Sequence, residues 1–338
     1  MSPPVPLVDL KTLQDASAFV KASGEIRQTP VALHVDDCLR SSDHGSALPP
    51  SCTVHLKLEN AQVGGSFKLR GVVNQIAHLD VDDPSAAHLF TISGGNYGKA
   101  FATLVNRKAY KNTVLMPTSA PLERVALIES LGSTVVRVDT SQLLDKVQEY
   151  QASGLTFVDS IDDHNLVNGY SSLGFELADV FQDIDVLLVP CGGGGLLAGI
   201  SAAFGLLGRK TKVFGVEPET ADSMRQSFER NEAVKMPGAH SVASGLAPPF
   251  AGRLTFPLCK QFAAGICTVS DSQIIAAMKT LHESLGLLVE PSGAAGVAAL
   301  LFGKVPVDLQ NKTVVVVISG GNISLDNFRT LSAEETHD

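Results

Sequence analysis

The sequence contains no tryptophan and only four tyrosines among its 338 residues. Its cysteines are odd in number, widely spaced and without a Cys-X-X-Cys pair: Cys38, Cys52, Cys191, Cys259 and Cys267. This usage predicts a reducing compartment and no zinc site. Blocks of lysine or arginine are also missing, and the net charge is -9. An acidic chain without basic blocks is not expected to bind nucleic acid.

Two further absences concern targeting and membranes. The segment from Met1 to Asp9 has neither the basic region nor the apolar core of a signal peptide. The most apolar segment, residues 186–207, is interrupted by Pro190 and by four consecutive glycines. That interruption favours a strand, a turn and a buried helix over a membrane span. We therefore expect a soluble, cytoplasmic protein that does not contact membranes.

Glycine and apolar residues are abundant instead. The chain has 30 glycines and is 44% hydrophobic and 18% charged, which is typical of a globular α/β protein. Strand-like and helix-like segments alternate between His88 and Val158 and again between Tyr170 and Val216. This alternation predicts βαβ units and parallel sheets. A long irregular stretch, residues 231–253, interrupts the pattern, and such loops are usually functional.

The length and the layout of these segments predict two domains. We expect a larger domain formed by residues 1–86 and 160–338. A smaller domain, residues 87–159, would be inserted within it.

The segment Gly64 to Gly71 reads Gly-Gly-Ser-Phe-Lys-Leu-Arg-Gly and joins two periodic segments. Residues 54–59 alternate between apolar and polar, as in a strand, and apolar residues recur at helical spacing over residues 67–79. Lys68 is therefore expected in the first turn of a helix, with Ser66 as its cap. A helix N-terminus disfavours a cation by about 0.3–1 kcal/mol and so helps to hold an amine neutral. A nucleophilic lysine needs a neutral amine, although most lysines are only solvated surface residues.

Three strand-like segments end in glycine-rich turns, and ligands of open α/β sheets bind at such carboxyl ends. The first turn, Ser93-Gly94-Gly95-Asn96-Tyr97-Gly98, opens a helix, so its N–H groups can hold a carboxylate and Asn96 can donate a hydrogen bond. The last turn, Ser319-Gly320-Gly321-Asn322, places a hydroxyl at the end of a strand. Taken alone, either turn can also be explained as a capped structural turn.

The middle turn lies between a buried strand and a buried helix and contains Gly192, Gly193, Gly194 and Gly195. Four glycines in a row let N–H groups approach an anion at a helix N-terminus, which is a common way to hold phosphate. The same turn fits the dinucleotide pattern GxGxxA, with Glu217 at the end of the next strand as the ribose acid. It is not a Walker A loop. The turn alone leaves simple phosphate and dinucleotide equally open, so an NAD-binding dehydrogenase is one alternative.

Together these segments resemble the fold-type II pyridoxal-phosphate enzymes, in the branch of threonine/serine dehydratases and serine racemases. The resemblance covers nearly the whole chain, and its four motifs follow in the family's order: residues 65–71, 93–98, 192–195 and 319–322. Ser241 to Ala247 and Val289 to Gly293 also have counterparts there. A dehydrogenase would leave three of the four motifs unexplained. The resemblance implies a tryptophan synthase β-like fold: two open, twisted, mostly parallel sheets flanked by helices, with a small substrate-side domain inserted in a larger cofactor-binding one.

The resemblance also implies a role for each motif. Lys68 would bind pyridoxal 5'-phosphate as a Schiff base and, once released, take the Cα proton of the substrate. Phe67 would pack against the cofactor ring, and Asn96 would bond its hydroxyl. The glycines 192–195 would hold the phosphate. The substrate carboxylate would be bound by the first turn: Ser93, Gly94, Gly95, Asn96 and Tyr97.

Ser319 would stand beside the pyridine nitrogen. A neutral hydroxyl does not force that nitrogen to be protonated, which suits β-elimination. We therefore expect a pyridoxal-phosphate-dependent ammonia-lyase that converts a β-hydroxy amino acid, L-threonine or L-serine first, into a 2-keto acid and ammonia. The alternatives are a hydroxyaspartate or aryl-serine dehydratase, a serine racemase-like enzyme, a β-replacement enzyme and a cofactor-binding protein with little catalysis. The family suggests a homodimer.

Two positions of the first turn depart from the family's pattern. Gly94 stands where serine racemases usually carry a second serine, which argues against racemisation as the main activity. Tyr97 stands where many dehydratases have histidine. A tyrosine there either contacts a substrate larger than serine or only shapes the turn.

A divalent-cation site of the family would involve Glu217 and the carbonyl of Ala221. Its third ligand position falls on Ser223, with Asp222 one place early. Metal binding is therefore left open. The chain also stops soon after the Ser319 turn, so the regulatory tail of biosynthetic threonine dehydratases is not expected.

Overall fold

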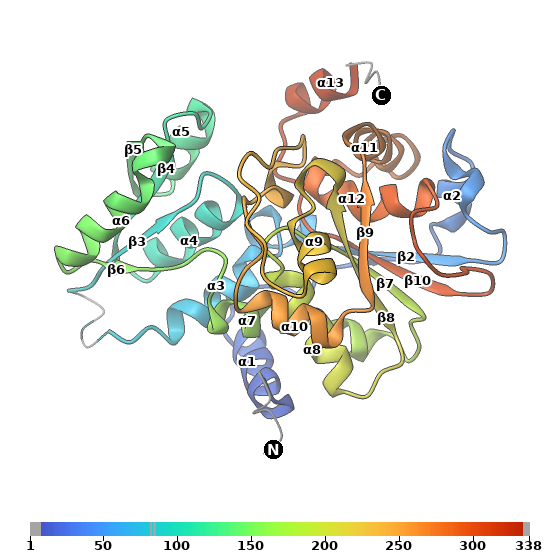
Figure 1. Cartoon of the computed structure of the whole chain (residues 1–338), viewed down its shortest axis with the longest axis horizontal. Helices are drawn as coiled ribbons and strands as arrows, with labels where there is room; N and C mark the ends of the chain where they lie inside the picture. The colour runs from blue at the N-terminus through green and yellow to red at the C-terminus, as the bar shows by residue number, and fades with distance from the viewer. Residues whose placement is uncertain (1–7, 82, 84–85, 334–338) are drawn as a thin grey trace.

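The structure is a computed structural model, and it describes residues 8–81, 83 and 86–333. The expectation about a signal peptide rests mainly on residues 1–7, which lie outside the described residues. Within the described part, the chain folds into a six-stranded and a four-stranded sheet flanked by helices (Figure 1). No helix of this part is long and apolar enough to cross a membrane.

The six-stranded sheet has the order β1-β2-β10-β7-β8-β9. Its strands are β1 (Val31–Ala32), β2 (Thr53–Leu58), β10 (Thr313–Ile318), β7 (Val186–Pro190), β8 (Lys212–Pro218) and β9 (Gly265–Val269). All pairings are parallel except that of β1 with β2. The central strand β10 is a continuous run of β-branched residues, as expected for a parallel strand that is covered on both faces.

The four-stranded sheet has the order β5-β4-β3-β6, and all its pairings are parallel. Its strands are β3 (His88–Ile92), β4 (Lys111–Pro117), β5 (Thr134–Val138) and β6 (Thr156–Phe157). Figure 1 shows this sheet and its helices on the left, beside the larger sheet. All four strands fall within residues 87–159, the expected small domain. The domain boundaries themselves, between residues 86 and 87 and between residues 159 and 160, stay a prediction.

Two hydrophobic clusters cover the two faces of the larger sheet. On β10, Val315 and Val317 point into one cluster, whereas Val314, Val316 and Ile318 point into the other. The first cluster also contains residues of α1 (Leu10–Ala22), α3 (Lys68–Ala77), α4 (Asn96–Arg107), α5 (Leu122–Ser130), α7 (His164–Val180), α8 (Gly195–Leu206), α9 (Ser223–Arg230) and α10 (Thr255–Phe262). The second contains residues of α2 (Asp36–Arg40), α11 (Asp271–Leu285), α12 (Pro291–Leu301) and α13 (Leu325–Ala333). A third, small cluster joins β3 and β4 to α6 (Leu143–Ala152).

Most expected elements are confirmed within a few residues, but four helices differ. A helix was expected from Tyr170, yet α7 begins at His164, because the Asp163 side chain accepts the N–H of Leu166 at 2.7 Å and caps the earlier turn. The helices α2, α9 and α10 were not expected. Between α9 and α10, residues 231–253 are irregular as expected, apart from one short 3-10 turn.

A buried ion-pair cluster fixes the start of α3. Arg70 donates to both oxygens of Glu59, which follows β2, at 2.8 and 2.9 Å. It also pairs with Glu176 of α7 at 2.9 Å, and Glu176 pairs with Lys57 of β2 at 2.5 Å. These contacts hold the first turn of α3, which carries Lys68, against the sheet and α7.

Candidate active site

Lys68 is the first residue of α3 and so lies in the first turn of a helix, as expected from the sequence. The expectation that Ser66 caps this helix is wrong: the N-cap is Phe67 without a side-chain bond, and Ser66 instead forms a β-bridge with Gly320. The Lys68 Nζ atom lies 4.8 Å from the centre of the Phe67 ring and 5.6 Å from that of Tyr170. Desolvation lowers the pKa of Lys68 to about 8, although the charge of Glu290 opposes this effect. The amine is therefore more often neutral near neutral pH than that of an exposed lysine.

The glycine turn between β7 and α8 forms an anion cradle. Within the described part of the chain, the N–H groups of residues 192–194 have no backbone acceptor. They lie at the N-terminus of α8, where the helix dipole favours an anion. Gly194 has a φ of +93°, and a Cβ atom there would lie 2.4 Å from the Met224 Cε atom. The turn therefore requires glycine and presents unpaired donors.

The asparagine turn, residues 93–98, opens α4. The Ser93 Oγ atom accepts the N–H of Gly98 at 3.0 Å and so pairs one donor of the first helical turn, although the N-cap of α4 is Gly95 and has no side-chain bond. The Asn96 side chain donates to Glu290 at 2.5 Å and accepts from Asn322 at 2.8 Å. Asn96 lies on the helix that follows β3 of the smaller sheet. It is therefore bonded to two segments, at Glu290 and Asn322, that lie outside that sheet.

Tyr97 is buried, and its side chain belongs to the hydrophobic cluster between α3 and α4. Its hydroxyl donates to the Gln75 Oε1 atom at 2.6 Å, and its ring stacks on Phe101. Of the two interpretations of Tyr97 above, this position favours the one in which the ring shapes the turn.

The serine turn, residues 319–322, lies directly beside the segment 64–71, which carries Lys68. The N–H of Phe67 donates to the carbonyl of Ser319 at 3.0 Å, and the N–H of Gly321 donates to the carbonyl of Gly65 at 3.0 Å. Ser319 is buried, and its Oγ atom lies 3.4 Å from the Ser292 carbonyl. The carboxyl end of β10 thus holds the residues around Lys68 in place.

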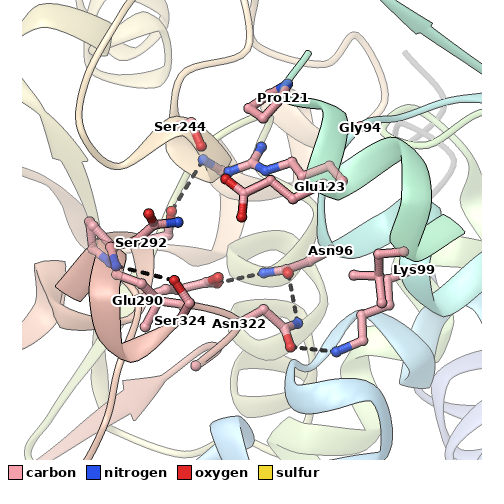
Figure 2. A pocket seen from close by; sticks show the side chains of 18 of the residues that line it. Gly94, Asn96, Lys99, Pro121, Glu123, Ser244, Glu290, Ser292, Asn322 and Ser324 are labelled. Carbon is pink, nitrogen blue, oxygen red and sulfur yellow. Dashed lines mark hydrogen bonds between the residues drawn. The ribbon is translucent and has the colours of Figure 1, made fainter.

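All the residues expected from the four motifs line one cavity of about 490 Å³, which we call the inner cavity. They are Phe67, Lys68, Ser93, Gly94, Gly95, Asn96, Tyr97, Gly192, Gly193, Gly194, Gly195 and Ser319. A second cavity of about 580 Å³, the outer cavity, adjoins it and is lined partly by α5 and α13. Asn96, Arg124 and Glu290 line both. Figure 2 shows the outer cavity, with Asn96, Lys99, Glu290 and Asn322 converging below it.

A family model described as pyridoxal-phosphate dependent enzyme matches residues 23–320. The chain belongs to this family. It is 34% identical over 278 residues to the L-threonine ammonia-lyase of Thermotoga maritima, which covers 81% of this chain and 68% of that protein. It is 34% identical over 323 residues to the phenylserine dehydratase of Ralstonia pickettii, which covers 95% and 97%. The structure of maize serine racemase matches with a TM-score of 0.84 and 26% identity over 96% of each chain.

The inner cavity fits the cofactor of these pyridoxal-phosphate-dependent enzymes. Pyridoxal phosphate carries an aldehyde that a neutral amine can attack and a phosphate that needs several donors. The cavity offers Lys68, with its lowered pKa, and the unpaired N–H groups of residues 192–194. The dinucleotide alternative loses its support, because Glu217 is fully buried and accepts the N–H groups of Met224 and Arg225 at 2.9 and 2.8 Å.

These contacts of Glu217 also concern the divalent-cation site that the resemblance implies. Both carboxylate oxygens of Glu217 are used by the first turn of α9, and burial raises the pKa of Glu217 to about 8. Asp222 accepts from the Arg225 Nε atom at 2.7 Å. Among the described residues, no group of three or more His, Cys, Asp or Glu side chains is suited to a metal ion. We therefore assign no metal ligands.

Sequence reasoning missed several residues that line or support the two cavities. Glu290 and Asn322 belong to motifs noted in the sequence, but nothing there marked their side chains. Tyr170 lies in the middle of α7, whereas Lys99 and Arg124 lie near the starts of α4 and α5, but none of the three belongs to a motif noted in the sequence. They are found only because α7, α5 and α4 converge on the cavities.

Proposed function

We propose that the chain catalyses the β-elimination of a β-hydroxy amino acid, with L-threonine and L-serine as the first candidates, and releases a 2-keto acid and ammonia. The proposal is carried by the position of Lys68, whose amine lies in one cavity with an anion cradle and a helix N-terminus. The relatives named threonine ammonia-lyase and phenylserine dehydratase support the same reaction class.

When bound, pyridoxal phosphate supplies an electron sink that stabilises negative charge at the substrate Cα. The Lys68 Nζ atom would hold the cofactor and, once released, would remove the proton from Cα. The rings of Phe67 and Tyr170 would exclude water around that amine. The N–H groups of residues 192–195 would bind the phosphate. The Ser319 hydroxyl would meet the pyridine nitrogen as a neutral partner.

The N-terminus of α4 would bind the substrate carboxylate through residues 93–97. The helix dipole favours an anion there, and within the described part of the chain the N–H groups of residues 94, 96 and 97 have no acceptor. Asn96 would contact the ring hydroxyl. Gly94 carries no acid or base, so it cannot return a proton to Cα, the role that the resemblance implies for the second serine of the racemases. Elimination is therefore favoured over racemisation.

The test is to replace Lys68 by alanine in the purified, cofactor-supplemented enzyme. We expect wild-type protein to release keto acid and ammonia in equal amounts, and Lys68→Ala to lower kcat at least 1000-fold, about the effect of losing a catalytic base and nucleophile. Lys108→Ala, at the exposed end of α4, is the control. Full turnover by Lys68→Ala would refute the proposal, and D-serine formation without ammonia would favour a racemase. A need for a second nucleophile would favour β-replacement.

A second candidate substrate is an aryl-serine. Apolar residues line much of the inner cavity: Ile92, Pro117, Ala120, Leu143 and Ile161. The phenylserine dehydratase of R. pickettii matches this chain over nearly the full length of both. The ratio of kcat/KM for L-threo-phenylserine to that for L-threonine decides between the two. L-threo-3-hydroxyaspartate is the third substrate to compare, because the cation of Arg124 also reaches the inner cavity.

We also propose that the protein is a cytoplasmic homodimer. The family resemblance implies the dimer, and the cysteines support a reducing compartment because those at 52, 191, 259 and 267 are buried free thiols. In the proposed arrangement, residues 1–86 and 160–338 form the cofactor-binding domain and residues 87–159 form the substrate-side domain. Sedimentation equilibrium measures the oligomeric state, and a monomer at micromolar concentration would refute the dimer.

A further inference from the structure

A chain of hydrogen bonds runs from the outer cavity to the inner one (Figure 2). The Lys99 Nζ atom donates to Asn322 Oδ1 at 2.6 Å. The Asn322 Nδ2 atom donates to Asn96 Oδ1 at 2.8 Å and to the Gly64 carbonyl at 2.9 Å. The Asn96 Nδ2 atom donates to Glu290 at 2.5 Å.

The two ends of this chain determine the orientation of both carboxamides between them. A lysine ammonium can only donate hydrogen bonds, and a backbone carbonyl can only accept them. If the Asn322 amide were rotated by 180°, its NH₂ group would face the ammonium of Lys99 and its oxygen would face the carbonyl of Gly64. Both contacts would be repulsive, so only one orientation of Asn322 is compatible with its neighbours.

The orientation of Asn322 then determines that of Asn96. Because the Asn322 Nδ2 atom points to Asn96, the Asn96 oxygen must accept, and its NH₂ group must face Glu290 and the inner cavity. One of the two N–H bonds is used by Glu290. The other remains available for a ligand of the inner cavity, which Asn96 also lines.

The surroundings of Asn322 fit this role. A Cβ atom at Gly65 would lie 2.4 Å from the Asn322 Oδ1 atom, so glycine at that position leaves room for the side chain. Lys99 lies one turn after Asn96 on α4 and faces the same way. Within the described part of the chain, its ammonium donates to the amide oxygen of Asn322, and Glu290 is the charged group that acts on it from a greater distance.

We infer that Lys99 and Asn322 are positioning residues that orient the carboxamide of Asn96 toward the cofactor. The inference rests on the proposed function, because it takes the inner cavity to be the cofactor site. Neither residue touches that site directly: Lys99 and Asn322 line only the outer cavity. Their loss should therefore weaken cofactor binding through Asn96 and leave the binding of Lys68 and the phosphate cradle in place.

The experiment measures the dissociation constant of pyridoxal phosphate for the apoenzyme and the absorption maximum of the loaded enzyme. Lys99→Met removes the donor, and Asn322→Asp removes both amide donors while it preserves size and can still pair with Lys99. Lys99→Arg keeps a cation that only donates. Lys108→Met is the matched control, because it removes a cation from the far end of the same helix. Thermal unfolding of each apoenzyme reports on the fold.

We expect Lys99→Met and Asn322→Asp to raise the dissociation constant about tenfold and to shift the absorption maximum, as the loss of a charge-assisted hydrogen bond implies. Lys99→Arg should stay within about threefold of wild type, and Lys108→Met should equal wild type. Wild-type affinity and spectrum in the first two variants would overturn the inference, and so would a Lys99→Arg variant as defective as Lys99→Met. If Asn322→Asp does not fold, the two substitutions of Lys99 decide. Failure of the wild-type protein to bind the cofactor would instead refute the proposed function.

Discussion

At the scale of single residues, the site depends on how each polar side chain is desolvated or paired. Lys68 owes its lowered pKa mainly to desolvation, and the carboxylate of Glu290 is the charge that opposes it. The carboxyl of Glu290 has a raised pKa for the same reason, partly offset by its bond from Asn96. Desolvation thus disfavours the charged form of both groups.

The pKa of Lys68 predicts how the apoenzyme captures its cofactor. Only the neutral amine attacks an aldehyde, and a pKa lowered from 10.5 to about 8 shifts the neutral form to lower pH. The rate of pyridoxal-phosphate capture should therefore rise with pH up to about 8 and level off above it. Stopped-flow absorption between pH 6 and 10 measures this profile. A rate that keeps rising to pH 10 would show an amine of ordinary pKa.

Tyr97 allows a second prediction at this scale. In Tyr97→Phe, the buried Gln75 Oε1 atom loses its donor, which should lower the free energy of unfolding by about 1–3 kcal/mol. Because the ring still fills its place in the cluster, the ratio of kcat/KM for L-threonine to that for L-serine should stay constant. Urea unfolding and steady-state kinetics measure the two quantities. A changed ratio at unchanged stability would place the hydroxyl on the substrate.

At the scale of elements, the junctions between strands and helices build the site. The turns after β3, β7 and β10 all end at the inner cavity. The parallel strands β7 and β10 bring their carboxyl ends to one edge of the larger sheet, and the turn after β3 of the smaller sheet meets them there. The glycine turn before α8 is the most constrained of them. Gly194 combines a left-handed backbone with close contacts to Met224 and Thr255.

This constraint predicts different effects of alanine at two glycines that flank α8. Gly194→Ala adds a Cβ atom 2.4 Å from Met224 and should distort the cradle, raising the dissociation constant of pyridoxal phosphate at least tenfold. Gly208→Ala is the control, because φ is +69° there but nothing lies within 4 Å of the added atom. It should only lower stability, by about 1–2 kcal/mol. Equal cofactor affinity in the two variants would contradict this account of the cradle.

At the scale of the whole molecule, buried charges hold the lysine segment against the larger sheet. Glu59 is fully buried and pairs with Arg70 of α3. Arg70 also pairs with Glu176 of α7. A buried pair of this kind stabilises mainly because the loss of one partner leaves the other charge unpaired.

Arg70→Met should accordingly lower the free energy of unfolding by about 3–5 kcal/mol, since Glu59 would remain buried without its main partner. Arg107→Met is the control, because Arg107 forms an exposed pair with Glu25 and should contribute less than about 1 kcal/mol. Chemical unfolding followed by circular dichroism measures both. Similar losses in the two variants would show that the cluster does not stabilise the fold in this way.

The sequence was enough to predict the parallel α/β architecture and the motif residues of the inner cavity, and the resemblance of its four motifs implied the cofactor class. It could do so because these features are local: a strand, a glycine turn and the first turn of a helix follow one another within about ten residues. The position of Lys68 in the first turn of a helix and the strand at Thr313–Ile318 are examples that the structure confirms.

Which side chains meet in the site depends on the packing of distant segments. Asn96 and Asn322 are bonded although 226 positions separate them, and Asn96 and Glu290 are 194 positions apart. No local pattern encodes such a contact, because it depends on how the two sheets pack. Packing also turned the Tyr97 ring into the core and used both oxygens of Glu217 to cap α9. Periodicity and propensity describe neighbours along the chain, whereas the site is made by neighbours in space.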